Sequence, residues 1–160
     1  MHNPDPQSAI ETTPILEEVL CLIGPASKHR RSKKVLPGMP ISDLPQFRLI
    51  VPEQSHVTRR LLDTQAAISG VKLQIGWEVS SVAAILDLVR AGYGYAVMSE
   101  HAAAYWGHAN ELEARPLIEP RLHSTLCVCT AAHRKSSALA KRCIRLLPEL
   151  ILTSVPRRLR

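Results

Sequence analysis

The clearest pattern in the chain is a strand, a helix and a second strand in succession. Apolar and polar residues alternate over Leu73–Val79, a period of two that predicts a strand with one face on a core. Over Val82–Val89 the apolar positions recur at helical spacing, and Ser80–Ser81 stand where they can cap the first amide groups. Gly92 is placed to end that helix, and the short apolar run Tyr95–Met98 is typical of a strand inside a parallel sheet. The segment therefore predicts a βαβ unit.

The same periodicities place the other elements. Further strands are predicted at Ile15–Ile23, Arg48–Val51, Leu117–Ile118 and Thr125–Cys129. One helix is predicted with Ser55 as its cap, Val57, Leu61 and Ile68 along one side, and Gly70 beyond its end. A short helix starts at Ser99, one helical turn is expected at Ser42–Leu44, and the last helix runs from Ser137 to Ile151. Pro148 lies inside that last helix and predicts a kink or an early end.

The βαβ segment resembles a known family. Residues 79–98, V-S-S-V-A-A-I-L-D-L-V-R-A-G-Y-G-Y-A-V-M, are similar to the signature LVxxGxGxxxxP of the effector-binding domain of LysR-type transcriptional regulators. Gly92 and Gly94 match its glycines, and Ser99 stands where the family usually has proline. Three more segments resemble, in the family's order, its first crossing strand, its next strand-loop-helix and its returning strand: Thr13–Pro25, Leu49–Arg60 and Arg115–Thr130.

The resemblance implies an α/β fold, a periplasmic-binding-protein type II-like (Rossmann-like) lobe. Such a lobe has a mostly parallel sheet with helices on both faces, here with the remnant of a second lobe. We expect residues 1–25 to be a lead-in and first crossing strand of lobe I, residues 26–122 to be lobe II, and residues 123–160 to return to lobe I. The family's proteins open with a winged helix-turn-helix and the start of lobe I. We therefore expect an N-terminally truncated domain whose last helix leaves its apolar face, Leu139–Leu150, largely uncovered.

Composition agrees with one globular domain. The chain has 160 residues, of which 46% are hydrophobic and 21% are charged. Nowhere does it approach the roughly 18 uninterrupted apolar residues of a membrane span, and Met1–Pro6 lacks the basic start and apolar centre of a signal peptide. We therefore expect a cytoplasmic protein with no membrane partner.

The basic charge suggests a weaker alternative, a nucleic-acid-binding domain. The net charge is +6, with basic residues gathered in Lys28–Lys34 and Arg157–Arg160. Neither run has interleaved aromatic residues that would stack on bases, nor a paired-helix pattern that would enter a groove. Solvated loop and tail charge is the favoured interpretation, and DNA contact is expected only through an N-terminal domain missing from this chain.

Metal binding and catalysis have little support in the sequence. The four cysteines lack the C-x2-C spacing of zinc knuckles and are expected to be inert core thiols: Cys21, Cys127, Cys129 and Cys143. The seven histidines are scattered and form none of the common catalytic motifs. We expect no metal, no other cofactor and no enzyme.

A ligand site is expected where parallel strands end. Helix N-termini at that edge of a sheet point free amide hydrogens and a positive dipole end towards a ligand. Two such ends are Pro52–His56 and Ser80–Val82, although their serines would also be explained by helix capping alone. The resemblance adds that LysR-type domains bind small, commonly anionic effectors between two lobes with these loops. The predicted ligand-binding residues are Gln54, Ser55, Ser80, Ser81, Val82 and Met98.

The resulting hypothesis is the effector-sensing domain of a LysR-type regulator. It binds a small, anionic metabolite in an inter-lobe cleft, regulates transcription, and forms a homo-oligomer in the full-length protein. One alternative is a stand-alone small-ligand binding protein of the same type II fold, and another is a non-functional truncated remnant. Translating the DNA upstream of Met1 separates these: a helix-turn-helix supports the regulator, a secretion signal the binding protein, and neither the remnant.

Overall fold

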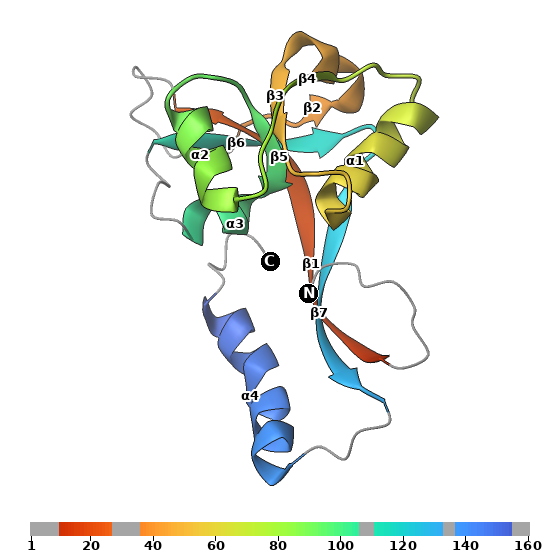
Figure 1. Cartoon of the computed structure of the whole chain (residues 1–160), viewed down its shortest axis with the longest axis vertical. Coiled ribbons are helices and arrows are strands. Elements are labelled where there is room, and N and C mark those ends of the chain that lie inside the picture. Colours follow the sequence, from red (N-terminus) through yellow and green to blue (C-terminus); the bar gives the residue numbers. More distant parts are fainter. Residues whose placement is uncertain (1–9, 27–35, 106–110, 133–136, 155–160) are drawn as a thin grey trace. The chain divides into compact units, whose positions relative to one another are not determined.

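A computed structural model describes residues 10–26, 36–105, 111–132 and 137–154 of the chain. The elements alternate between strands and helices along most of this length (Figure 1). In chain order they are β1 (Ile10–Pro25), β2 (Met39–Pro40), the 3-10 helix η1 (Ile41–Gln46), β3 (Arg48–Val51), α1 (Val57–Ile68), β4 (Gln74–Glu78), α2 (Val82–Arg90), β5 (Ala96–Ser99), α3 (Glu100–Tyr105), β6 (Leu112–Ile118), β7 (His123–Ala131) and α4 (Ala138–Ser154). Every helix and strand predicted from the sequence is present, and β1, β6 and β7 are longer than predicted.

The chain forms two compact units. The larger consists of the described residues of Glu18–Ser124, and the smaller consists of the described residues of Met1–Glu17 and Thr125–Arg160. Strands β1 and β7 contribute residues to both units. The basic runs Lys28–Lys34 and Arg157–Arg160 lie outside the described residues, so the structure does not bear on their role.

The sheet of the larger unit is mixed. Strand β3 pairs with β4 in parallel, with Val51 opposite Glu78. A parallel bridge between Leu49 and Tyr95 joins β3 to the start of β5. The two strands of the predicted βαβ unit, β4 and β5, are therefore both parallel to β3. The remaining partners differ: β1 pairs antiparallel with both β5 and β6, while β2 is parallel to β6. Strand β5 is therefore parallel to its neighbour on one side and antiparallel on the other.

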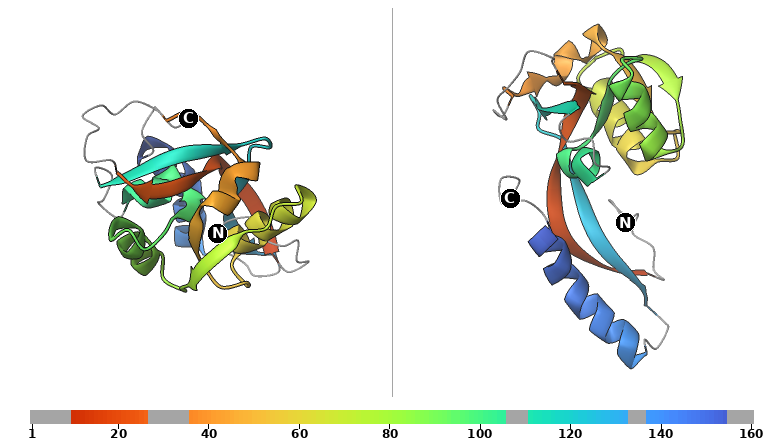
Figure 2. Two further views of the ribbon diagram at one scale, coloured as in Figure 1. Left: turned by 90° about the horizontal axis from the view of Figure 1, so that it is seen from above. Right: turned by 90° about the vertical axis from the view of Figure 1, so that its left-hand side faces the viewer.

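Two hydrophobic clusters cover the two faces of this sheet. Leu49 and Val51 of β3 belong to one cluster and Ile50 to the other, as the alternation of side chains along a strand requires. Helix α1 adds Leu62 to the first cluster, whereas α2 adds Leu86 and its neighbours to the second. Helices α1 and α2 thus pack on opposite faces of the strands, which lie between them in the view from above (Figure 2, left). This confirms the expected helix-covered sheet.

The predicted apolar side of α1 is only partly right. Leu61 packs against the first cluster, but Ile68 is 74% exposed. The buried positions are Arg59, Leu62 and Ala66, which follow the helical period but include a charged residue. An apolar pattern alone could not place this face, because one of its three buried side chains is a cation.

Helix α4 belongs to the smaller unit. The hydroxyl of Ser137 accepts a hydrogen bond from the amide of Ala140 at 3.1 Å and so caps the helix at the predicted start. The helix continues through Pro148 to Ser154, so the predicted early end is wrong. Its apolar face is open, with Leu139 72% and Leu150 62% exposed. This agrees with the expectation that the face lacks its covering.

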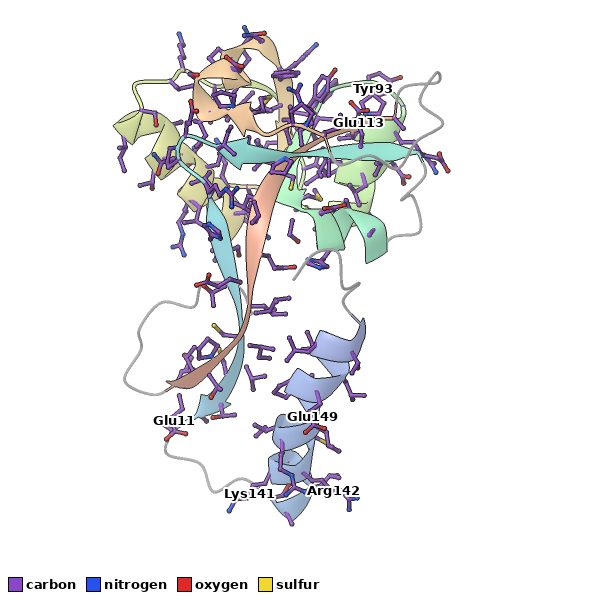
Figure 3. All side chains as sticks on the ribbon, turned by 180° about the vertical axis from the view of Figure 1, so that it is seen from behind. Glu11, Tyr93, Glu113, Lys141, Arg142 and Glu149 are labelled. Atoms are coloured by element: carbon purple, nitrogen blue, oxygen red, sulfur yellow. The ribbon has the colours of Figure 1, made fainter. Side chains whose placement is uncertain are left out.

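Cysteine placement is mixed. Cys21 and Cys127 are buried, as expected of core thiols, and Cys129 is half-buried. Cys143 is exposed on α4, so its assignment to a core is wrong. The same helix carries the charged side chains of Lys141, Arg142 and Glu149 (Figure 3). Burial raises the pKa of the Cys21 thiol to about 12, and the nearby negative charge of Glu100 adds to the increase.

Candidate ligand-binding site

The loops that follow β3 and β4 leave the sheet at one edge. Because the two strands are parallel and Val51 lies opposite Glu78, their carboxyl ends coincide. The pairing extends one step further, since the amide of Val79 donates to the carbonyl of Val51 at 2.9 Å. The segments Pro52–His56 and Val79–Ser81 therefore begin side by side. This is the arrangement that the sequence predicted for the ligand-binding edge.

Ser81 caps α2. It has extended backbone angles, and its hydroxyl accepts a hydrogen bond from the amide of Ala84 at 3.5 Å. Both Ser80 and Ser81 are exposed, so their hydroxyls remain accessible beside the first amides of the helix. The prediction that serine opens this helix is confirmed for Ser81.

Ser55 does not cap α1. The cap is His56, whose Nδ1 accepts a hydrogen bond from the amide of Thr58 at 3.2 Å. The chain first turns over Glu53–His56, where the amide of His56 donates to the carbonyl of Glu53 at 2.9 Å. This extra turn delays the start of the helix by one residue and leaves Ser55 exposed in the loop. The predicted cap was therefore wrong by one position.

The His56 cap leads to a stability prediction. Replacing His56 with alanine removes the acceptor for the Thr58 amide and should lower the free energy of unfolding by about 0.5–1 kcal/mol. Ser55→Ala is the matched control, and urea denaturation should show almost no change for it. If Ser55→Ala cost as much as His56→Ala, His56 would not be the cap.

Arg59 is the main site residue that the sequence did not indicate. Its side chain is 5% exposed, and its Nη1 donates to the carbonyl of Pro52 at 3.1 Å and to Glu78 Oε2 at 3.2 Å. Its Nε donates to Asp63 Oδ2, one helical turn on, at 2.7 Å. A single guanidinium thus ties the first turn of α1 to the ends of β3 and β4. It holds both loops in place at the edge.

A group of buried polar side chains lies where β5 ends at the same edge. Nδ1 of His101 lies 3.2 Å from Oε1 of Glu18, and the two side chains are 17% and 6% exposed. Ser99, 6% exposed, caps α3 by accepting from the amide of Ala102 at 3.2 Å. Ser124 is 2% exposed and lies on β7, two residues beyond Leu122, whose carbonyl accepts from Leu20 of β1. Polar side chains at this edge therefore lie on strands β1, β5 and β7 as well as on the two loops.

Two atoms of this polar group have no hydrogen-bond partner. Within the described residues, His101 Nε2 and Ser124 Oγ are buried and unpaired. Buried polar atoms in proteins are usually paired with protein groups, ordered water or a ligand. No pattern in the sequence indicates this group, because its members come from three segments that are far apart in the chain.

The six predicted ligand-binding residues fall into two sets. Gln54, Ser55, Ser80 and Ser81 are exposed on the two adjacent loops. Val82 and Met98 instead meet in the hydrophobic cluster under α2, where Met98 is 9% exposed. The first set can donate hydrogen bonds to a ligand, while the second forms apolar packing beneath it.

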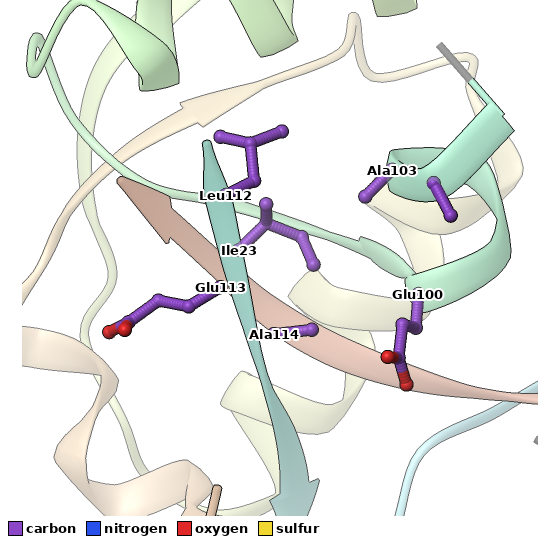
Figure 4. Close-up of a pocket in the computed structure, with 7 residues that line it drawn as sticks. Ile23, Glu100, Ala103, Leu112, Glu113 and Ala114 are labelled. Carbon is purple, nitrogen blue, oxygen red and sulfur yellow. The ribbon is translucent and has the colours of Figure 1, made fainter. Parts of the chain in front are cut away.

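A shallow pocket of about 310 Å3, open to solvent, lies beside α3 (Figure 4). Ile23, Leu112 and Ala114 gather next to Ala103, while the carboxylate of Glu113 points away from them. None of the predicted ligand-binding residues is among the described residues that line it. The described residues also bring together no group of three histidine, cysteine or acidic side chains that could hold a metal ion.

The sequence of residues 1–151 matches the family model of the LysR substrate binding domain. The chain belongs to the LysR substrate-binding domain family. Within the described residues, no helix has the length and apolar character needed to span a membrane.

Relatives of this family member agree in sequence and fold. The chain is 26% identical over 155 residues to the HTH-type transcriptional regulator BbuR of Bordetella bronchiseptica, covering 97% of this chain but only 46% of that protein. Among solved structures, the Synechocystis PCC6803 CcmR regulatory domain in complex with 2-PG superposes with a TM-score of 0.75 at 21% identity, covering 93% of this chain and 71% of that one. The effector binding domain of QuiR in complex with shikimate gives 0.66 at 18% identity, with coverage of 91% and 66%. At these sequence identities, the similarity to the CcmR and QuiR domains shows a shared fold.

Proposed function

We propose that this chain is the effector-sensing part of a LysR-type transcriptional regulator, and that its effector is a small, anionic metabolite. The effector binds at the edge where β3 and β4 end, against the N-termini of α1 and α2. The observation that carries the proposal is the parallel pairing of β3 and β4, since it opens two helix N-termini at one edge. Binding changes the activity of the whole regulator rather than a reaction catalysed by this domain.

The chemistry of the edge supports an anion. The first amides of both helices lack carbonyl partners within the helix and carry the positive end of the helix dipole. Exposed donors on the loops, namely Gln54, Ser55, Ser80 and Ser81, add hydroxyl and amide groups within reach. Glu78 also lies there, but it is held by Arg59. The positive character that attracts an anion therefore comes mainly from backbone amides, and the exposed carboxylate of Glu53 on the same loop acts against it.

The relatives support the ligand class. The CcmR and QuiR domains were each solved with a small molecule, 2-PG and shikimate, and shikimate is a carboxylate. A carboxylate fits amide hydrogens at a helix N-terminus without needing a buried cation. We infer that the effector of this chain presents a carboxylate, or a group of like charge, to α1 and α2.

The proposal extends to the whole protein. The chain spans about half the length of the curated relative it matches. In the full-length regulator, DNA is read by a separate N-terminal segment, and the protein acts in the cytoplasm as a homo-oligomer. Ile75 and Trp77 support an oligomer, since they are 44% and 46% exposed on β4, which pairs only with β3 among the described strands.

A thermal-shift screen against carboxylates, amino acids and sugars tests the ligand class. A ligand at about 100 times its dissociation constant stabilises the folded state by about 2.7 kcal/mol, which raises the Tm of a chain of this size by roughly 5–10 °C. We expect carboxylates to give the shift, and the double variant Ser80→Ala, Ser81→Ala to lose it.

Ser42→Ala is the control, because Ser42 is an exposed serine on η1 outside the two loops. It should keep the full shift. A full shift in the double variant would remove the two serines from the site, and a response to neutral sugars alone would contradict an anionic effector.

A further inference from the structure

A second pocket lies at the other edge of the same sheet. It is lined by side chains of β1, β6 and the residues just before β3 and β5, and it offers about 300 Å3 that is open to solvent. Phe47 precedes β3 and Tyr95 precedes β5, so the pocket lies at the amino ends of the parallel strands, opposite the loops of the proposed effector site. Its lining residues are Leu22, Gly24, Phe47, Tyr95, Glu113 and Arg115.

Arg115 gives this pocket a free donor. It stands on β6 opposite Leu22 of β1, and both side chains line the pocket. Its Nε is buried and has no hydrogen-bond partner among the described residues. An unpaired buried donor on a permanent cation is unfavourable, so an acceptor that enters the pocket relieves this cost. A carboxylate can serve as this acceptor, because a guanidinium binds carboxylates through two parallel N–H groups. Glu113 lines the same pocket and opposes a second negative charge, so the ligand can carry only one carboxylate and must gain the rest of its binding from apolar contacts.

Two aromatic rings form an apolar wall beside this cation. Phe47 and Tyr95 are in edge-to-face contact, with ring centroids 4.8 Å apart and an interplanar angle of 77°. The ring of Tyr95 lies over Gly24, where an added Cβ would come within 2.6 Å of Tyr95 Cε1. The glycine is therefore what lets the ring occupy its place in the pocket. A ligand with a flat or apolar body can pack against this wall while its charged end reaches Arg115.

We propose that this pocket is a second ligand site, which takes a small monocarboxylate with an apolar body. The carboxylate accepts hydrogen bonds from the Arg115 guanidinium, and the body packs against Phe47 and Tyr95. The site is separate from the edge formed by β3 and β4, so it does not depend on the proposed effector. Benzoate, a carboxylate on a flat apolar ring, is the simplest probe with this chemistry.

Titration with sodium benzoate, followed by NMR, tests the proposal on the full 160-residue chain. The Nε–H cross-peak of Arg115 should move and saturate as benzoate is added. Arg115→Gln should weaken binding at least tenfold, read from the ring signals of Tyr95. Arg115→Lys keeps the positive charge but lacks the two parallel N–H donors of a guanidinium, so it should bind benzoate more weakly than the unaltered chain. Arg121→Gln is the matched control, since Arg121 is an exposed arginine near the end of β6, and it should bind benzoate normally.

Each contrary outcome overturns the proposal. If the Arg115 cross-peak moved without saturating, or if Arg121→Gln lost as much benzoate binding as Arg115→Gln, the effect would be non-specific attraction to a basic chain. Absence of any movement would mean that the Arg115 donor is satisfied by water. Sodium sulfate at equal ionic strength should bind more weakly than benzoate, and equal binding would contradict an apolar body. The Ser80→Ala, Ser81→Ala variant should keep this site, which separates its failure from failure of the proposed effector site.

Discussion

Replacing Gly94 with alanine is expected to lower the free energy of unfolding by about 3 kcal/mol. A Cβ at this position would lie 2.6 Å from the backbone oxygen of Arg48 and 3.0 Å from Cγ1 of Ile50. A backbone oxygen cannot move aside as the end of a side chain can. The change must push β3 away from β5 and strain their two hydrogen bonds, from Tyr95 to Arg48 at 2.9 Å and from Ile50 to Tyr95 at 2.7 Å. Urea denaturation measures the loss.

Gly92→Ala is the control for this effect. Gly92 has φ +83° with nothing within 4 Å of an added Cβ, so alanine there meets only the left-handed backbone penalty. That penalty is about 1–2 kcal/mol. The two glycines that match the family signature therefore serve different purposes, one ending α2 and the other allowing two strands to approach. If Gly92→Ala were the more harmful change, the close approach of β3 and β5 would not be what requires Gly94.

Replacing Arg59 with alanine is expected to cost about 2–3 kcal/mol of stability. The variant leaves the carbonyl of Pro52 without its charged donor and opens a space at the base of α1. The two carboxylates contribute less to this figure, because Asp63 and Glu78 are about half exposed and can return to water. The loops at the carboxyl edge should also lose their fixed spacing. We therefore expect the thermal shift by the effector to fall together with the stability.

Arg60→Ala is the matched control for Arg59. Arg60 is the next residue on the same helix turn but is exposed, so its removal should change stability by less than about 0.5 kcal/mol. Urea denaturation measures the loss of stability in both variants, with the midpoints compared at a common m value. Equal losses in the two variants would mean that net charge, and not the buried contacts of Arg59, sets the result.

Together these residues show how a sensor edge is built on this sheet. Gly94 sets the separation of β3 and β5, and Arg59 sets the position of α1 against the ends of β3 and β4. The exposed donors that we assign to the effector stand on loops between these fixed points. In the proposed site, the rigid part is thus made of residues other than the exposed donors that we assign to the effector.

Local patterns were sufficient where neighbours along the chain decide the structure. The alternation over Leu73–Val79 and the helical spacing after Ser81 each depend on a few adjacent residues, and β4 and α2 appear as predicted. The end of α2 at Gly92 follows from the same local rule, since glycine adopts a positive φ at little cost. The α1 cap shows the limit of this approach, because a turn over Glu53–His56 moved it from Ser55 to His56.

The sequence by itself determined the elements other than the two-residue strand β2, their order and the resemblance to the family, because periodicity, caps and glycines act over a few residues. Only the tertiary structure decided which strands of the sheet are antiparallel, which face of α1 is buried, and which polar groups meet. Arg59, the pair Glu18 and His101, and the donor of Arg115 came from this second source. Glu78 lies on a different element from Arg59, Glu18 lies on a different element from His101, and Arg115 Nε has no partner among the described residues. No spacing in the sequence encodes such contacts, because only folding brings these elements together.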